Sequence, residues 1–257
     1  PVPPTGRREA VVHRALLSAR SAVLAHGDFS PLFADLDEHL ARWNLPVDPL
    51  GRTMLRTGLA SVGLHLSSRP RDEVVGVTLS VQKPPLNLFL GGDAEQGNLI
   101  GRVFASEQVE EHPDNRLFVQ TRRRKGHTSQ TVLEVMGLDL PLIFEQLHAR
   151  SEQFPSRFFD YDDGRLAMVQ ALPGVDEAWL QSLERGAVED LVDHAGQDLD
   201  QRIYRLECGC DEERMRVAVK GMYSDDLDAL FQEESSLEVL CPRCGRTWRL
   251  ERSHLED

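Results

Sequence analysis

The spacing of hydrophobic residues in the first part of the chain predicts helices. In residues 9–26, four apolar side chains fall on one helical face: Val12, Leu16, Ala19 and Val23. Apolar residues that recur every three or four positions are typical of an amphipathic helix, so we expect one here. A second helix is expected over residues 32–43. Residues 50–66 contain glycines that would weaken an isolated helix, so we expect a buried helix packed closely on its neighbours.

The period then changes to two, which predicts strands. Apolar residues alternate with small or polar ones over 75–81 and 86–90, and a third strand is expected at 99–104. The polar run 93–98 is expected to be a turn, so these strands would form an antiparallel meander. Residues 110–126 predict a loop and an edge strand.

The second half of the core is expected to mix helices with a strand. The pattern predicts helices at 140–150 and 175–185, and a strand at 166–172. In the first of these helices the residues expected on the buried side are Leu142, Phe144 and Leu147. The chain therefore predicts an α+β fold, with antiparallel sheet packed against helices.

Composition excludes some classes of partner. The chain of 257 residues carries a formal net charge of −13. Affinity for duplex nucleic acid comes largely from Lys and Arg on phosphates, so nucleic acid is not expected as a partner, and neither is an anionic membrane surface. No apolar run approaches the roughly 20 residues of a spanning helix, and residues 1–8 do not resemble a signal peptide. A cytoplasmic protein is expected.

The four cysteines are clustered near the carboxyl end. Cys208 and Cys210 form a C-x-C pair, and after 30 intervening residues Cys241 and Cys244 form a C-x-x-C pair. Four thiolates with no cysteine left over match a closed tetrahedral zinc site, which has no open position for catalysis. Two structural disulfides, unbound thiols or an iron–sulfur cluster are the alternatives, although the spacing fits none of the ferredoxin patterns.

We place a domain boundary just before the cysteines. Residues 1–174 are expected to form the α+β core, residues 175–205 a short helical linker, and residues 206–257 a small zinc-binding domain. The last segment has few large apolar residues, so burial alone would stabilise it poorly. Metal binding would supply much of its folding free energy, and we expect the segment to unfold when zinc is removed.

Other polar clusters are assigned to ordinary surface structure. The basic run 121–127 is expected to be a solvated loop or a guard on an exposed strand edge, and the acidic run 160–164 a turn. His254 is close enough in sequence to replace a cysteine ligand, but we assign it to the surface. Ser129 and Ser151 have histidines nearby, but the nucleophile elbow is missing. No enzymatic activity is expected.

Several segments together resemble one family. The motif C-G-C-D-E-E-R-M at 208–215, the acidic segment 225–234 and the run L-E-V-L-C-P-R-C-G-R-T-W-R-L at 237–250 are similar to the zinc module of the heat-shock protein 33 family. Upstream segments resemble the same family: residues 50–66, 89–103, 149–156 and 168–174. The first 45 residues match poorly, and the stretch from Pro173 to Cys208 is shorter than the family's usual linker.

The resemblance implies a redox-regulated holdase chaperone that works without ATP. The reduced, zinc-bound form would be compact and inactive as a chaperone. Oxidation to Cys208–Cys210 and Cys241–Cys244 disulfides would expel the ion, loosen the tail and linker, and free apolar surface for unfolding client proteins. The resemblance also implies a homodimer in the oxidised state. The shortened linker favours the alternative, a binding or adaptor protein whose zinc module is purely structural.

Overall fold

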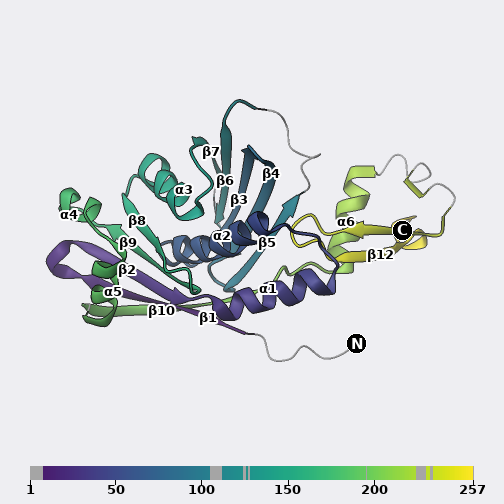
Figure 1. Ribbon diagram of the computed structural model, residues 1–257. Helices are drawn as coiled ribbons and strands as arrows, with labels where there is room; N and C mark the ends of the chain where they lie inside the picture. Colours follow the sequence, from purple (N-terminus) through teal and green to yellow (C-terminus); the bar gives the residue numbers. More distant parts are fainter. Residues whose placement is uncertain are drawn as a thin grey trace.

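The computed structural model describes residues 8–104, 112–123, 126, 128–194, 196–223, 230–231 and 234–256. It is an elongated molecule (Figure 1), in which a large sheet with its helices forms one part and a small C-terminal module lies at one end of it. The mixed α+β fold with a large sheet confirms the predicted fold class.

Within the described residues ten strands form one sheet, in the order β7-β6-β3-β4-β5-β10-β1-β2-β9-β8. The strands are β1 Ala10–Leu17, β2 Ala22–Asp28, β3 Glu73–Gln82, β4 Pro85–Asp93, β5 Asn98–Phe104, β6 Asn115–Arg123, β7 Thr128–Val135, β8 Ser156–Asp160, β9 Arg165–Ala171 and β10 Gln197–Leu206. All neighbouring pairs are antiparallel except β10 and β5, which run parallel.

The helices of the core are α1 Ser30–Arg42, α2 Pro49–Ser67, α3 Leu140–Leu147, α4 Glu177–Gln181 and α5 Arg185–His194, with a short 3-10 turn at Ser18–Arg20 and a π turn at His148–Glu152. The C-terminal module contains α6 Glu212–Tyr223, the two-stranded sheet of β11 Ser236–Leu240 and β12 Thr247–Glu251, and α8 Ser253–Glu256. The predicted helices at 32–43 and 50–66 are thus confirmed as α1 and α2.

The helix predicted over 9–26 is wrong, because this segment forms the hairpin of β1 and β2. A β-bulge between Arg14 and Ala15 shifts the register of β1 against β10. The extra residue of the bulge, Leu199, lies on β10, and β1 keeps a regular register with β2. The buried side chains of β1 change phase because different clusters cover its two faces: Ala10 and Val12 lie in the main core, whereas Leu17 lies in a second cluster with side chains of α4 and α5. A strand with such a change of phase places apolar residues at a mixture of spacings that resembles a helix.

The predicted meander is confirmed by the pairing of β3 with β4 and of β4 with β5. Its second turn contains Gly97, whose φ of +68° lies in the left-handed region. The strand expected within 110–126 is confirmed as β6, but its expected position at the edge of the sheet is wrong, because β6 lies between β3 and β7, and β7 is the edge. Arg123, from the basic run, pairs with the buried carboxylate of Glu73 at 3.0 Å. Lys125 and His127 lie outside the described residues.

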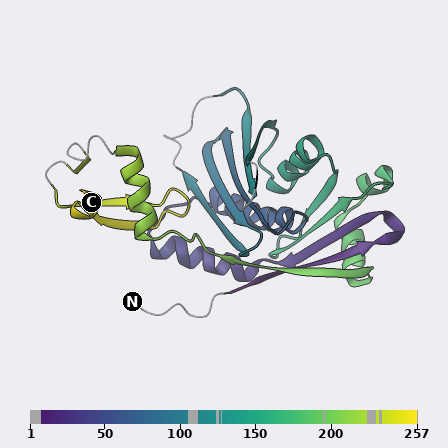
Figure 2. The same cartoon turned by 180° about the vertical axis from the view of Figure 1, so that it is seen from behind.

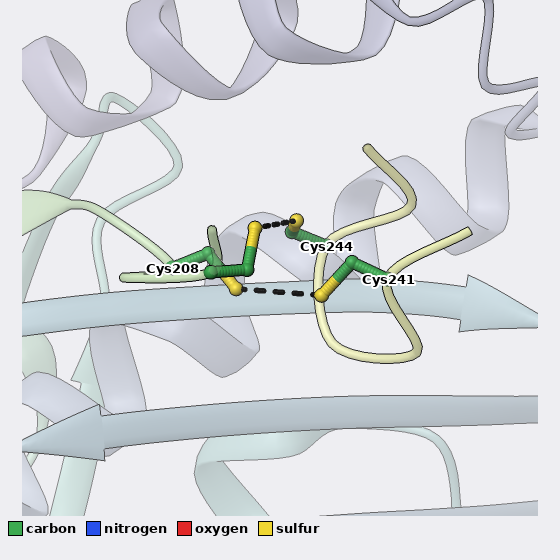
Figure 3. A group of neighbouring side chains, drawn as sticks. Cys208, Cys241 and Cys244 are labelled. Atoms are coloured by element: carbon green, nitrogen blue, oxygen red, sulfur yellow. Dashed lines mark hydrogen bonds between the residues drawn. The ribbon is translucent and has the colours of Figure 1, made fainter. Parts of the chain in front are cut away.

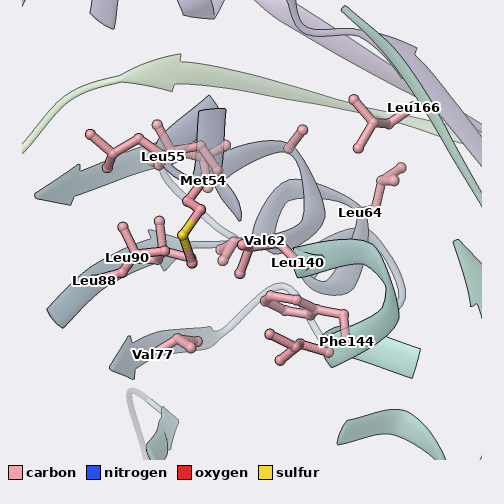
Figure 4. Packing of buried hydrophobic residues seen from close by; sticks show 14 of the residues in the cluster. Met54, Leu55, Val62, Leu64, Val77, Leu88, Leu90, Leu140, Phe144 and Leu166 are labelled. Carbon is pink, nitrogen blue, oxygen red and sulfur yellow. The ribbon is translucent and has the colours of Figure 1, made fainter. Parts of the chain in front are cut away.

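Helix α2 packs closely between the two halves of the sheet (Figure 4), as its small residues predicted. A Cβ at Gly58 would lie 2.8 Å from Cδ1 of Leu90, so a larger residue would clash. On α3, Phe144 and Leu147 are fully buried as expected. Leu142 is wrong as a buried residue, since its side chain is 49% exposed.

Strand β10 joins the two halves of the sheet and leads into the module (Figure 2). It pairs with β1 over most of its length and with β5 only at Arg205–Asn98 and Leu206–Leu99. Residues 197–205 were expected within a helical linker but form most of β10, so this part of the prediction is wrong, whereas α4 and α5 supply helices in the earlier part of the linker. Cys208 follows the end of β10 after one residue.

Candidate metal centre

Two separate segments supply the cysteines. The chain that leaves β10 carries Cys208 and Cys210, and the turn between β11 and β12, residues 241–246, carries the C-x-x-C pair; we call this turn the knuckle. The knuckle is closed by two backbone hydrogen bonds: the amide of Cys241 donates to the carbonyl of Arg246 at 2.9 Å, and the amide of Gly245 donates to the carbonyl of Cys241 at 2.8 Å.

A glycine allows each segment its sharp turn. Gly209 lies between the cysteines of the C-x-C pair with a φ of +63°, and Gly245 follows the C-x-x-C pair with a φ of +76°. Side chains other than glycine adopt these left-handed angles at a cost, which explains why glycine stands at both positions.

The four sulfurs converge on a single point. The Sγ atoms of Cys208 and Cys241 are 3.7 Å apart, those of Cys210 and Cys244 are 3.6 Å apart, and all four lie within 4.8 Å of one another (Figure 3). Four ligands at the zinc–sulfur distance of about 2.3 Å in a tetrahedron are separated from each other by about 3.8 Å. The observed spacing fits a metal ion of this size held by four thiolates.

Because the sulfurs lie so close together, the pKa values of the thiols differ from one cysteine to another. Hydrogen bonds from Cys208 and Cys244 to Cys241 lower the pKa of the Cys241 thiol far below its ordinary value. The hydrogen bond with Cys241 raises the pKa of Cys208 to about 12, and contacts with Cys208 and Cys241 raise the pKa of Cys244. Since the thiolate is the form that binds a metal, a cation among the four sulfurs is what would let all of them ionise together.

The module around the site has a small core of its own. Apart from the cysteines, its buried side chains pack in one cluster: Val219, Phe231, Leu250 and Leu255. The cluster is far smaller than the core formed by α1, α2, α3 and the large sheet. The module is therefore of the kind that depends on a bound metal for its stability.

Other residues that the sequence singled out lie away from the cysteines or outside the described chain. The acidic run forms the predicted turn between β8 and β9, with Asp162 at a φ of +64°. The side chain of His254 and most of the acidic motif 225–234 lie outside the described residues. Within the part of the chain that the structure describes, the cysteines form the one group of three or more potential ligands that meet closely enough to share an ion.

Sequence reasoning did not predict that the knuckle would dock against the core. Cys241 and Cys244 are almost completely buried, and they pack with Ile100 of β5 and Phe89 of β4. The alternation of β5 could have predicted this contact. Ile100 is on the face of the strand that points away from α2, and an apolar residue there indicates that another part of the chain packs on that face.

Fold and site together define a class of protein. It is one in which a small module, with four cysteines positioned to bind a metal ion, is docked on an α+β core domain. The arrangement offers ligands on all sides of the central position and leaves none open, which is typical of a structural or regulatory site and not of a catalytic one.

Comparison with known proteins identifies the family. The model of the Hsp33 protein family matches residues 93–251, so the chain belongs to the Hsp33 family. A 33 kDa chaperonin of Desulforamulus reducens is 22% identical over 255 residues, which cover 83% of this chain and 85% of that protein. The 33 kDa chaperonin of Azotobacter vinelandii is 24% identical over 262 residues, covering 88% and 87% of the two chains.

The fold is that of a solved member of the family. The crystal structure of the 33 kDa chaperonin of Thermotoga maritima, a heat-shock protein 33 homologue, aligns with 97% of each chain at a TM-score of 0.70 and 14% identity. Membership in a family of chaperones implies that this chain binds unfolded proteins. No helix among the described residues has the length and apolar character to span a bilayer.

Proposed function

We propose that this protein is a redox-regulated, ATP-independent holdase that protects unfolding proteins from aggregation during oxidative stress. The observation that carries the proposal is the convergence of four cysteine sulfurs, from two distant segments, at zinc–thiolate spacing. Family membership supports the chaperone activity. We propose that it acts in the cytoplasm on unfolded clients, with neither nucleic acid nor membrane as a partner.

In the reduced form Cys208, Cys210, Cys241 and Cys244 would hold one Zn²⁺. The bound ion would neutralise thiolate charge and tie the C-x-C segment to the knuckle. The chain supplies four soft sulfur ligands on tight turns, and the buried knuckle keeps water from two of them.

The switch is an oxidation of these thiolates. In each sequence-adjacent pair, two thiolates give two electrons to one hydrogen peroxide, which takes up two protons and leaves as two waters while one S–S bond forms. The products would be the Cys208–Cys210 and Cys241–Cys244 disulfides, at the expense of two peroxides. Cys208 and Cys210 are partly exposed whereas the other pair is buried, so oxidant reaches the C-x-C pair more directly.

Loss of the ligands would unfold the module, because its own apolar cluster is small. The surface beneath the knuckle would then be open to clients, including Phe89 and Ile100. We propose the division into a core of residues 1–174, a connecting segment of 175–205 and a switch module of 206–257. We also propose that the oxidised form is a homodimer.

A second function is supported by β10. This strand pairs with β1 along the segment where part of a helical linker was expected, and the carboxylate of Asp200 forms ion pairs with Arg14 at 2.7 Å and with Arg202 at 3.0 Å. A connecting segment fixed in this way favours a binding or adaptor protein whose zinc module is purely structural.

One experiment separates the two functions. The zinc-loaded, reduced protein is treated with peroxide at raised temperature, zinc release is followed with a chromogenic chelator, and suppression of aggregation of a chemically unfolded client is measured. Zinc loss together with new holdase activity is the result expected of the switch. Retained zinc, or zinc loss without activity, would support the adaptor. A variant with all four cysteines changed to serine is the control for activity that does not depend on the site.

A further inference from the structure

Two side chains of the core hold the backbone of the knuckle. Nε2 of His39 donates to the carbonyl oxygen of Cys244 at 2.7 Å, and Nη1 of Arg102 donates to the carbonyl oxygen of Cys241 at 3.0 Å. His39 lies in the last turn of α1 and Arg102 lies on β5. The core therefore contacts the first and the last residue of the C-x-x-C pair, from two different elements.

Stacking and apolar packing add to this contact. The guanidinium of Arg246 lies 5.2 Å from the ring centre of Trp43 on the core and 3.9 Å from that of Trp248 on β12. Nε of Arg246 is buried and has no hydrogen-bond partner among the described residues, so the group is held between the two rings by stacking. Gly245 lies against Leu45, where an added Cβ would come within 2.7 Å of Cδ1.

These contacts act on the metal site without touching the sulfurs. A C-x-x-C pair binds an ion well only when its backbone already has the turn geometry, and the two carbonyls fix that backbone. Each hydrogen bond of this kind contributes about 1 kcal/mol, which corresponds to about a five-fold change in an equilibrium constant.

Resting on the proposed function, we propose that His39 and Arg102 are positioning residues of the metal site, through which docking on the core sets how tightly the ion is held. The coupling is reciprocal: if the docked core favours zinc binding, bound zinc must stabilise the core by the same factor. The core surface at the end of α1 and on β5 then sets the threshold at which oxidant releases the ion.

The test is a competition for zinc. Reduced, zinc-loaded full-length protein is titrated with a chromogenic chelator. His39→Ala and Arg102→Ala are each expected to give up zinc at about five-fold lower free chelator than the unchanged protein. His39→Gln, whose side-chain amide can donate to the same carbonyl, is expected to recover most of the difference. His13→Ala and Arg116→Ala, which change exposed residues on β1 and β6, are the matched controls and are expected to have no effect.

A second measurement separates positioning from a general loss of fold. Thermal unfolding of the core is followed with and without zinc. Without zinc the variants are expected to unfold at the same temperature as the unchanged protein, and with zinc they are expected to gain less stability than it does. Unchanged zinc transfer in both variants, or an equal loss of stability with and without zinc, would overturn the proposal.

Failure of this inference is distinguishable from failure of the proposed function. If the variants hold zinc normally while peroxide still converts the unchanged protein into a holdase, the redox function stands and the positioning role is refuted. If the variants lose zinc as expected but the oxidised protein never acquires activity, the positioning role stands and the redox function is refuted.

Discussion

A chain of buried hydrogen bonds inside the core predicts that the protein loses stability in mild acid. Nδ1 of His65 on α2 lies 2.8 Å from Nε2 of His148, and Nδ1 of His148 lies 2.9 Å from Oγ of Ser156. Oγ of Ser156 donates to the carbonyl of Phe154 at 3.4 Å. Because the hydroxyl of Ser156 donates to this carbonyl, its Oγ accepts a hydrogen bond from Nδ1 of His148, and Nε2 of the neutral His148 accepts one from Nδ1 of His65. Both imidazoles are fully buried.

Burial sets the sign of the pH dependence. Desolvation, with a smaller contribution from the charge of Arg69, lowers the pKa of His65 to about 3 from an ordinary value of 6.5. Desolvation, and after it the neighbouring His65, lowers the pKa of His148 well below the same value. The unfolded chain therefore binds more protons than the folded chain below about pH 6.5, so stability is present above that pH and is lost as pH falls.

The expected loss follows from the number of protons taken up. Each proton that only the unfolded chain binds costs about 1.4 kcal/mol per pH unit, so two histidines together cost about 4 kcal/mol between pH 6.5 and pH 5. Urea unfolding of the zinc-free, reduced protein at a series of pH values measures this, because the metal ligands then contribute no protons of their own. His65→Gln is expected to halve the slope. A free energy of unfolding that is flat over this range, or an unchanged slope in His65→Gln, would refute the reasoning.

Three further predictions concern the module and its connection. Gly245→Ala is expected to weaken zinc binding by about ten-fold. The left-handed backbone alone costs a residue other than glycine about 1–2 kcal/mol, and the new methyl group would clash with Leu45. Chelator competition measures the affinity for zinc, and an unchanged affinity would contradict the prediction. Cys210→Ser is expected to abolish stoichiometric zinc and to melt α6 in the reduced protein, as seen by metal analysis and circular dichroism; retained zinc would contradict the four-ligand site. After peroxide, the amide of Glu207, which donates to the carbonyl of Leu99 at 2.9 Å, is expected to exchange quickly with solvent. The amide of Arg202, which faces β1 opposite Val12, is expected to stay protected. Hydrogen exchange that is equal at both positions would show that the whole strand opens.

Much of the meander and of the metal centre could be predicted from the sequence, because local patterns determine both. Alternation in β3 and β4 reflects one face packed on α2, and the spacing of the cysteines reflects the reach of a single ion. The hairpin of β1 and β2 could not be predicted in this way, because burial of β1 passes from one face to the other, which breaks the alternation on which a strand prediction depends.

The docking of the knuckle is a second feature that local patterns do not contain. His39 belongs to a helix and Arg102 to a strand, and each looks like an ordinary surface residue until the chain is folded. Their contacts with Cys244 and Cys241 span 205 and 139 residues of sequence. Only the tertiary structure reveals such pairs.

The pairing of strand β10 determines how much of the core unfolds when zinc is released. Its last two residues, Arg205 and Leu206, pair with β5 and precede Cys208 almost directly, so unfolding of the module pulls first on this short parallel pairing. The remainder of the strand is held by β1 over a much longer register and by the ion pairs of Asp200. Parting from β5 would expose the edge of that strand while the hairpin of β1 and β2 stays folded. The core would then separate only between β10 and β5, and the rest of its sheet would stay folded. Such a switch can work with a short connecting segment, because the surface that binds clients would come from β5 and its neighbours and not from an unfolded linker.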